Sequence, residues 1–246
     1  MPVDALSLLS AVVAVAGASA AAVLGYWTQR RLRAVEQRDL METYGASLAW
    51  AAFDLQSRLY NILHGQEVDR APGPHRGFIT AFLKEGTEEE REYVRRSTAF
   101  VLAEYLGWVE ILRRDVQFLD LGRSRTNQRI VTVVSQAASA LNKAAPGRAF
   151  RLFRAQQRAI GELMIHPEGE PGRRRCLGYA EFSARLDTDD AFRRWFAPVL
   201  KDIDGLAEDT APAAPRLAEL QQTLIALIDL LDPKAARFPQ FRSAFG

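Results

Sequence analysis

The stretch from Ala5 to Trp27 constrains this chain most, because it holds 23 residues without a charged side chain. As an α helix rising about 1.5 Å per residue it would be roughly 34 Å long, and the hydrocarbon core of a bilayer is about 30 Å thick. We therefore predict one transmembrane helix. The expected organisation is an anchor at residues 1–28 followed by a helical domain at residues 29–246.

The C-terminal border of this stretch has the composition of a membrane interface. Tyr26 and Trp27 are aromatic residues of the kind that lie at the level of the lipid headgroups. They are followed by Arg30, Arg31 and Arg33. On the N-terminal side the nearest charge is Asp4. Because lysine and arginine favour the cytoplasmic side, we expect the N-terminus outside and the domain in the cytoplasm, at the inner membrane.

Two other interpretations of the stretch compete with the anchor. The "ASA" at residues 18–20 resembles the cleavage site of a signal peptide, but residues 2–4 lack a positive charge and the apolar run continues to Trp27. A buried core helix is the second alternative, since the many alanines lower the mean hydropathy. A run of 23 uncharged residues is long for that role.

Small residues recur in the stretch at intervals of four. This spacing lets two helix backbones approach closely in lipid, so it predicts packing between anchors and a homo-oligomer. An alanine-rich composition also produces this spacing by chance. The residues concerned are Ala14, Gly17, Ala18, Ala21, Ala22 and Gly25.

Composition excludes some classes of protein. The net charge is +2 with both signs spread along the chain, which does not indicate a nucleic-acid-binding protein. Cys176 is the single cysteine, so no intramolecular disulfide can form, as suits a reducing cytoplasm. The partners we expect are membrane lipid and either a second copy of this chain or another protein.

The rest of the sequence has helical periodicity, and alternating strand patterns are missing. Thr87 and Glu90 have the spacing of a capping box that opens a long helix. We expect an all-α fold, with an antiparallel helical bundle after the anchor. The expected helices cover residues 30–63, 87–121, 126–144, 148–165, 189–207 and 216–231, with a short apolar piece at 78–86, a cap at Asp187 or Thr188, and a kink or division at Pro198.

No sequence motif indicates a metal, a cofactor or a known catalytic constellation. The three histidines lie at expected helix ends or in loops, and Cys176 has no partner at ligand spacing. Charges embedded in apolar helices are the remaining candidates for a site, because oppositely charged residues four apart form pairs. The weak catalytic candidates are Glu110, Arg114, Arg158 and Glu162. The alternative is that such pairs are solvated or purely structural.

Two further segments, a loop with three arginines and the C-terminal tail, are candidates for contact with lipid or protein. Three consecutive arginines, Arg173 to Arg175, lie in an expected loop, where they either contact lipid headgroups or are solvated. Near the C-terminus Phe238, Phe241 and Phe245 are spaced like one face of a helix, and we expect this tail to dock on the protein's own surface.

The hypothesis favoured by these features is a membrane-anchored cytoplasmic protein that acts through protein contacts, as an adaptor, scaffold or sensor. A membrane-acting effector of a bacterial defence or toxin system is the first alternative. An enzyme that uses the carboxylate and arginine candidates is the second.

Overall fold

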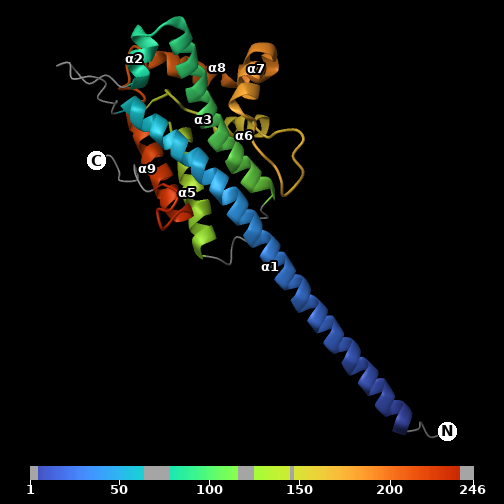
Figure 1. Cartoon of the computed structure of the whole chain (residues 1–246). Coiled ribbons are helices and arrows are strands. Elements are labelled where there is room, and N and C mark those ends of the chain that lie inside the picture. The colour runs from blue at the N-terminus through green and yellow to red at the C-terminus, as the bar shows by residue number, and fades with distance from the viewer. Residues whose placement is uncertain (1–4, 64–77, 116–124, 145–146, 239–246) are drawn as a thin grey trace. The chain divides into compact units, whose positions relative to one another are not determined.

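The structure is a computed structural model that describes residues 5–63, 78–115, 125–144 and 147–238. Within the first helix it describes the side chains of residues 13–29 and 44–63. The described residues form eight α helices and no β strand, which confirms the all-α class (Figure 1). The chain divides into two compact units, residues 1–43 and 44–246.

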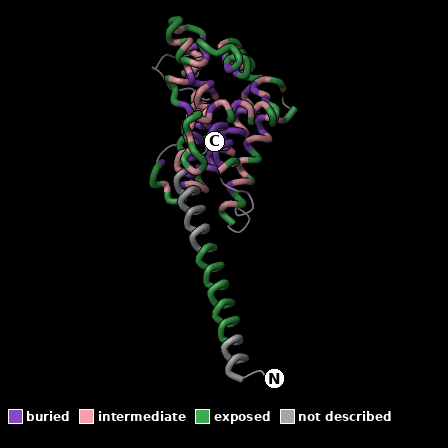
Figure 2. Tube along the Cα trace, turned by 90° about the vertical axis from the view of Figure 1, so that its right-hand side faces the viewer, coloured by how far each residue is buried: buried purple, intermediate pink, exposed green. Residues whose placement is uncertain are grey.

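The helix α1 (Ala5–Leu63) contributes residues to both units. From Tyr44 onward it buries side chains at intervals of three and four residues, which is the pattern of a helix with one face against a core. Residues 13–29 of α1 are all exposed (Figure 2). The buried residues of this part include Leu48, Ala52, Leu55, Leu59 and Ile62.

The C-terminal tail docks on α1 through Phe238. Its ring stacks on Phe53 with centroids 4.5 Å apart and meets Trp50 edge-on at 4.7 Å. The carboxylate of Asp232 accepts backbone hydrogen bonds from residues 236, 237 and 238, which fixes the approach. The expected docking is confirmed for Phe238, and the other two phenylalanines lie outside the described residues.

The helices α2 (Phe78–Glu85) and α3 (Glu88–Asp115) are joined by a short turn. The backbone N–H of Glu90 donates to the Thr87 hydroxyl at 3.2 Å, and the Thr87 N–H donates to the Glu90 carboxylate at 2.7 Å. The expected capping box is therefore confirmed. The expected end of this helix near Leu121 lies outside the described residues.

Four of the remaining helices are α5 (Arg125–Asn142), α6 (Arg154–Leu163), α8 (Asp190–Gly205) and α9 (Ala214–Leu231). The α5 and α9 helices pack along each other, α6 packs on α3, and α8 contacts both α3 and α6 (Figure 1). These contacts bury one apolar core within residues 44–246 (Figure 2).

The helix α7 (Tyr179–Thr188) was not expected, and it changes the boundaries around it. The expected caps at Asp187 and Thr188 are wrong, because both residues belong to α7. Asp189 instead accepts hydrogen bonds from the backbone N–H groups of Ala191 and Phe192. Phe182 of α7 packs against Phe192 and Phe196 of α8, so tertiary contacts hold this short helix.

Two other expected boundaries were wrong. The helix expected from residue 148 begins at Arg154, because Phe150 has a φ of 54° and its N–H donates to the Asp202 carboxylate at 2.8 Å. Of the kink or division expected at Pro198, the division is wrong, because α8 continues through this residue.

Candidate functional site

The site begins where α3 and α6 cross at two glycines. A Cβ atom on Gly161 would lie 2.6 Å from the carbonyl oxygen of Leu106 and 2.9 Å from the Cβ atom of Glu110. A Cβ atom on Gly107 would lie 2.8 Å from the Cβ atom of Met164. Because neither position has room for a side chain, the two helices approach closely, and Glu110 is buried beneath α6.

The carboxylate of Glu110 is surrounded by arginines. Arg113 donates from Nε at 2.7 Å and from a second nitrogen, and Arg114 donates from Nε at 2.8 Å. From α6, the Nε atom of Arg158 lies 3.9 Å from the carboxylate. Arg114 also pairs with Glu162 at 3.0 Å, and Arg158 lies 3.8 Å from Glu162.

The structure therefore brings the four candidate residues Glu110, Arg114, Arg158 and Glu162 together. Whether they have a catalytic role stays a prediction. Some of the ion pairs lie within one helix, at a spacing of four residues. The pair between Arg114 and Glu162 joins α3 to α6. Sequence reasoning missed Arg113, although its three-residue spacing from Glu110 was a usable signal.

The electrostatics of Glu110 favour a permanent charge. Burial alone raises the pKa of its carboxyl, but the hydrogen bonds from Arg113 and Arg114 outweigh burial, and the net shift is downward. A carboxylate with a lowered pKa is a weak proton acceptor near neutral pH. The arrangement thus suits an ion-pair link between helices, or a charged rim for a ligand, better than acid–base chemistry.

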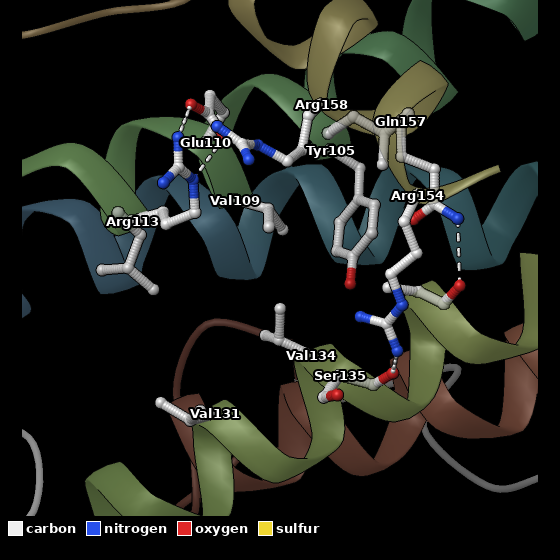
Figure 3. Close-up of a pocket in the computed structure, with 13 residues that line it drawn as sticks. Tyr105, Val109, Glu110, Arg113, Val131, Val134, Ser135, Arg154, Gln157 and Arg158 are labelled. Atoms are coloured by element: carbon white, nitrogen blue, oxygen red, sulfur yellow. Dashed lines mark hydrogen bonds and ion pairs between the residues drawn. The ribbon is translucent and has the colours of Figure 1, made fainter. Parts of the chain in front are cut away.

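Beside this cluster lies a cavity of about 290 Å³ between α3, α5 and α6 (Figure 3). Its apolar walls come from α3 and α5, and its polar groups lie mainly on α3 and α6. Glu110, Arg113 and Arg158 belong to its lining, so the cavity and the charge cluster are continuous. The apolar lining consists of Leu106, Val109, Leu112, Val131, Val134 and Ala138.

Two lining residues, the buried Tyr105 and the exposed Arg154, have polar groups that pair with no charged side chain among the described residues. The hydroxyl of Tyr105 is buried and has no hydrogen-bond partner among the described residues. Arg154 donates to the Ser139 hydroxyl at 2.8 Å and lies 3.4 Å from the Ser135 carbonyl, and no described carboxylate pairs with it. Sequence reasoning did not single out the hydroxyl of Tyr105.

A second polar group lies where α1 meets α3. Burial and the charge of Asp54 raise the pKa of Glu104 to about 7, although a hydrogen bond with Trp108 lowers it in part. Burial, with a contribution from Glu104, raises the pKa of the Cys176 thiol well above its usual range. Because a thiol of this kind stays protonated, Cys176 is not an activated nucleophile.

The residues expected in the membrane are exposed wherever their side chains are described. Tyr26 and Trp27 contact each other edge-on, with centroids 6.5 Å apart. A Cβ atom on Gly17 or Gly25 would meet nothing within 4 Å. The other small residues, Ala14, Ala18, Ala21 and Ala22, are exposed as well. The side chains of Arg30, Arg31 and Arg33, and those of residues 5–12, lie outside the described set.

In the part of the chain that the structure describes, no helix combines the length and the apolar character needed to cross a bilayer. The transmembrane helix therefore has no support from the structure and stays a prediction.

The loop of three arginines is partly anchored. Arg174 forms an ion pair with the buried carboxylate of Asp115 at 2.9 Å. Asp115 also accepts hydrogen bonds from the Tyr44 hydroxyl at 2.7 Å and from the Gly172 N–H at 2.9 Å. Arg175 lies 3.6 Å from Glu168. The fold thus engages two of the three arginines that were considered for lipid contact.

Among the described residues, no group of three histidine, cysteine, aspartate or glutamate side chains is placed to hold a metal ion. Comparisons with protein-family models, with curated protein sequences and with solved structures found no match.

Proposed function

We propose that this protein is a single-pass membrane-anchored domain that acts by binding a partner or ligand, as an adaptor, scaffold or sensor, and not by catalysing a reaction. The observation that carries the proposal is the exposed apolar surface of α1 between residues 13 and 27. Val13, Val15, Val23 and Leu24 are 55–67% exposed, and Tyr26 and Trp27 are 61% and 55% exposed. A contiguous apolar surface of this kind marks contact with a membrane or with another protein.

The sequence around this surface favours lipid over water. Ala5 to Trp27 contains no charge, its aromatic border suits the headgroup region, and Arg30, Arg31 and Arg33 follow at once. We propose on this basis that the stretch lies in the inner membrane, with the antiparallel helical bundle on the cytoplasmic side. The exposed small residues, Gly17 and Gly25 among them, support packing of one anchor against another.

The binding role is favoured by the site. Glu110 is held as a carboxylate by arginines, and the thiol of Cys176 is not activated. The cavity beside Glu110 gives the domain a place for a small ligand, which suits a sensor.

The experiment is fractionation of the tagged full chain, expressed in a bacterial host. We expect it in the membrane pellet after alkaline carbonate extraction. A C-terminal tag should be protected from protease in intact spheroplasts and cleaved after lysis. A V15D/A18D variant should be released from the membrane, because each charge at the centre of a spanning helix costs about 3 kcal/mol. The matched V15L/A18L variant should stay in the pellet.

Extraction of the unaltered chain by carbonate would contradict the anchor. Digestion of the tag in intact spheroplasts would contradict the orientation.

A further inference from the structure

We propose that the cavity between α3, α5 and α6 binds an amphipathic monocarboxylate, with its carboxylate at Tyr105 and Arg154 and its apolar chain along the valines of α3 and α5. This proposal goes beyond the membrane-anchored function and does not depend on it. All the residues involved belong to the unit of residues 44–246.

The first support is the hydroxyl of Tyr105. Tyr105 is 1% exposed, and its hydroxyl has no hydrogen-bond partner among the described residues. Burial of a hydroxyl without a hydrogen bond is costly, so a buried tyrosine usually has one. In Figure 3 the Tyr105 side chain points from α3 toward α5, into the cavity. A ligand oxygen at this position would accept the missing hydrogen bond.

The second support is the charge of the lining. It contains three arginines and one glutamate, so its net charge is positive. Arg113 is committed to Glu110, whereas Arg154 contacts only neutral groups among the described residues. In Figure 3 Arg154 reaches from α6 to Ser135 of α5. A carboxylate complements an arginine of this kind better than any neutral group does.

The third support is the apolar wall. Val109, Val131 and Val134 line the cavity beyond the polar groups, so a fully polar anion such as phosphate would leave this wall unused. The ligand should therefore have an apolar chain as well as a charge.

The volume limits the size of that chain. At roughly 30 Å³ for each water-sized group, a cavity of about 290 Å³ holds about ten non-hydrogen atoms. Octanoate has about that size, whereas a membrane lipid with two long acyl chains is several times larger. A free medium-chain carboxylate therefore fits this volume better than a whole bilayer lipid does.

The test is isothermal titration of octanoate into the full chain, held in nanodiscs of zwitterionic phosphatidylcholine, with empty nanodiscs as the blank. Saturable binding to one site is expected. Octan-1-ol, which has the same chain length without the charge, should bind at least tenfold more weakly. If the chain proves soluble without lipid, the same titration runs in buffer, so failure of the anchor proposal does not affect the result.

Three variants locate the binding. Tyr105→Phe and Arg154→Gln should each weaken octanoate binding roughly tenfold, because each removes a hydrogen bond to a charged group. Tyr105→Phe should leave the thermal midpoint unchanged or raise it, since the lost hydroxyl has no partner in the fold. Arg129→Gln is the matched control, because Arg129 of α5 is exposed and does not line the cavity. It should bind like the unaltered chain.

Several results would overturn the proposal. Heat that does not saturate, or that equals the empty-nanodisc blank, shows only partition into lipid. Equal affinities for the unaltered chain and both binding-site variants would place octanoate elsewhere. Octan-1-ol that binds as tightly as octanoate would show an apolar cavity without a carboxylate site.

Discussion

Arg216 of α9 is a fully buried cation whose hydrogen-bond partners in the described chain are all backbone carbonyls. It donates to the carbonyls of residues 140, 141, 143, 147 and 149, at distances from 2.6 to 3.4 Å. Several of these belong to the end of α5 and the turn after it, where helical carbonyls lack intrahelical partners. Burial lowers the pKa of Arg216, but a guanidinium stays charged at neutral pH. The Arg216 side chain thus caps the C-terminal end of α5 and links this helix to α9.

Replacement of Arg216 by lysine should lower the free energy of unfolding by roughly 2–3 kcal/mol, because a lysine amine cannot reach all these carbonyls. Urea denaturation followed by circular dichroism measures this change. Arg194→Lys, at an exposed position of α8, is the control and should change stability by less than about 0.5 kcal/mol. Equal stability of the two variants would show that the buried carbonyls find other partners.

Glu104 predicts a dependence of stability on pH. Its pKa rises from 4.5 to about 7 on folding, chiefly through burial, so the folded state holds the proton more tightly than the unfolded state does. Stability from this group is complete below about pH 4.5 and is lost as the pH rises toward 7. Glu104→Gln should remove this loss and raise stability at pH 8 by roughly 1–3 kcal/mol.

Urea denaturation of Glu104→Gln at pH 5 and pH 8 tests this prediction. Glu208→Gln, at an exposed position, provides the comparison. If Glu104→Gln and Glu208→Gln show the same difference between the two pH values, burial does not control the titration of Glu104.

At the scale of elements, the crossing of α3 and α6 depends on Gly161. Its added Cβ atom would meet backbone, which cannot move as a flexible side chain can. Gly161→Ala should therefore destabilise the protein by about 2 kcal/mol, although alanine favours helix. Gly205→Ala is a matched control, since a Cβ atom there meets nothing within 4 Å. Thermal unfolding should separate the two variants by several degrees, and equal midpoints would contradict the close crossing.

Local sequence signals predicted most of the elements and failed where distant contacts decide. The capping box of α3 depends on neighbours in the same helix, and this prediction was correct. The late start of α6 depends on Asp202, far away in sequence. The short α7 is held by aromatic rings of α8. Such contacts leave no periodic pattern in one segment.

The same distinction applies to the candidate site. Pairs within one helix, such as Glu110 with Arg114, could be found from their spacing. The approach of Arg158 from α6 could not, because it requires the glycine crossing. The cavity and the free hydroxyl of Tyr105 depend on how three helices pack, so they become visible only in three dimensions.

At the scale of the whole molecule, association of the anchors has its own test. Gly17→Leu combined with Gly25→Leu should lower the fraction of oligomer, since both positions lie on the proposed packing face. Within the chain these leucines meet no described neighbour, so folding is unaffected. Ser19→Leu lies on the opposite side of the helix and serves as the control. Cross-linking in mild detergent measures the fraction of oligomer. If the unaltered chain is monomeric in this assay, self-association is contradicted.

The hydroxyl of Tyr44 touches the Asp115 carboxylate and also accepts from the backbone N–H of Arg174 at 3.1 Å. A shortened chain that starts after residue 44 would therefore remove a hydrogen-bond donor from the Asp115 carboxylate, which is only 2% exposed. It would also remove the acceptor for the backbone N–H of Arg174 in the neighbouring loop. A chain shortened for crystallisation should therefore begin before Tyr44, because only residues that precede it can be removed without losing these hydrogen bonds.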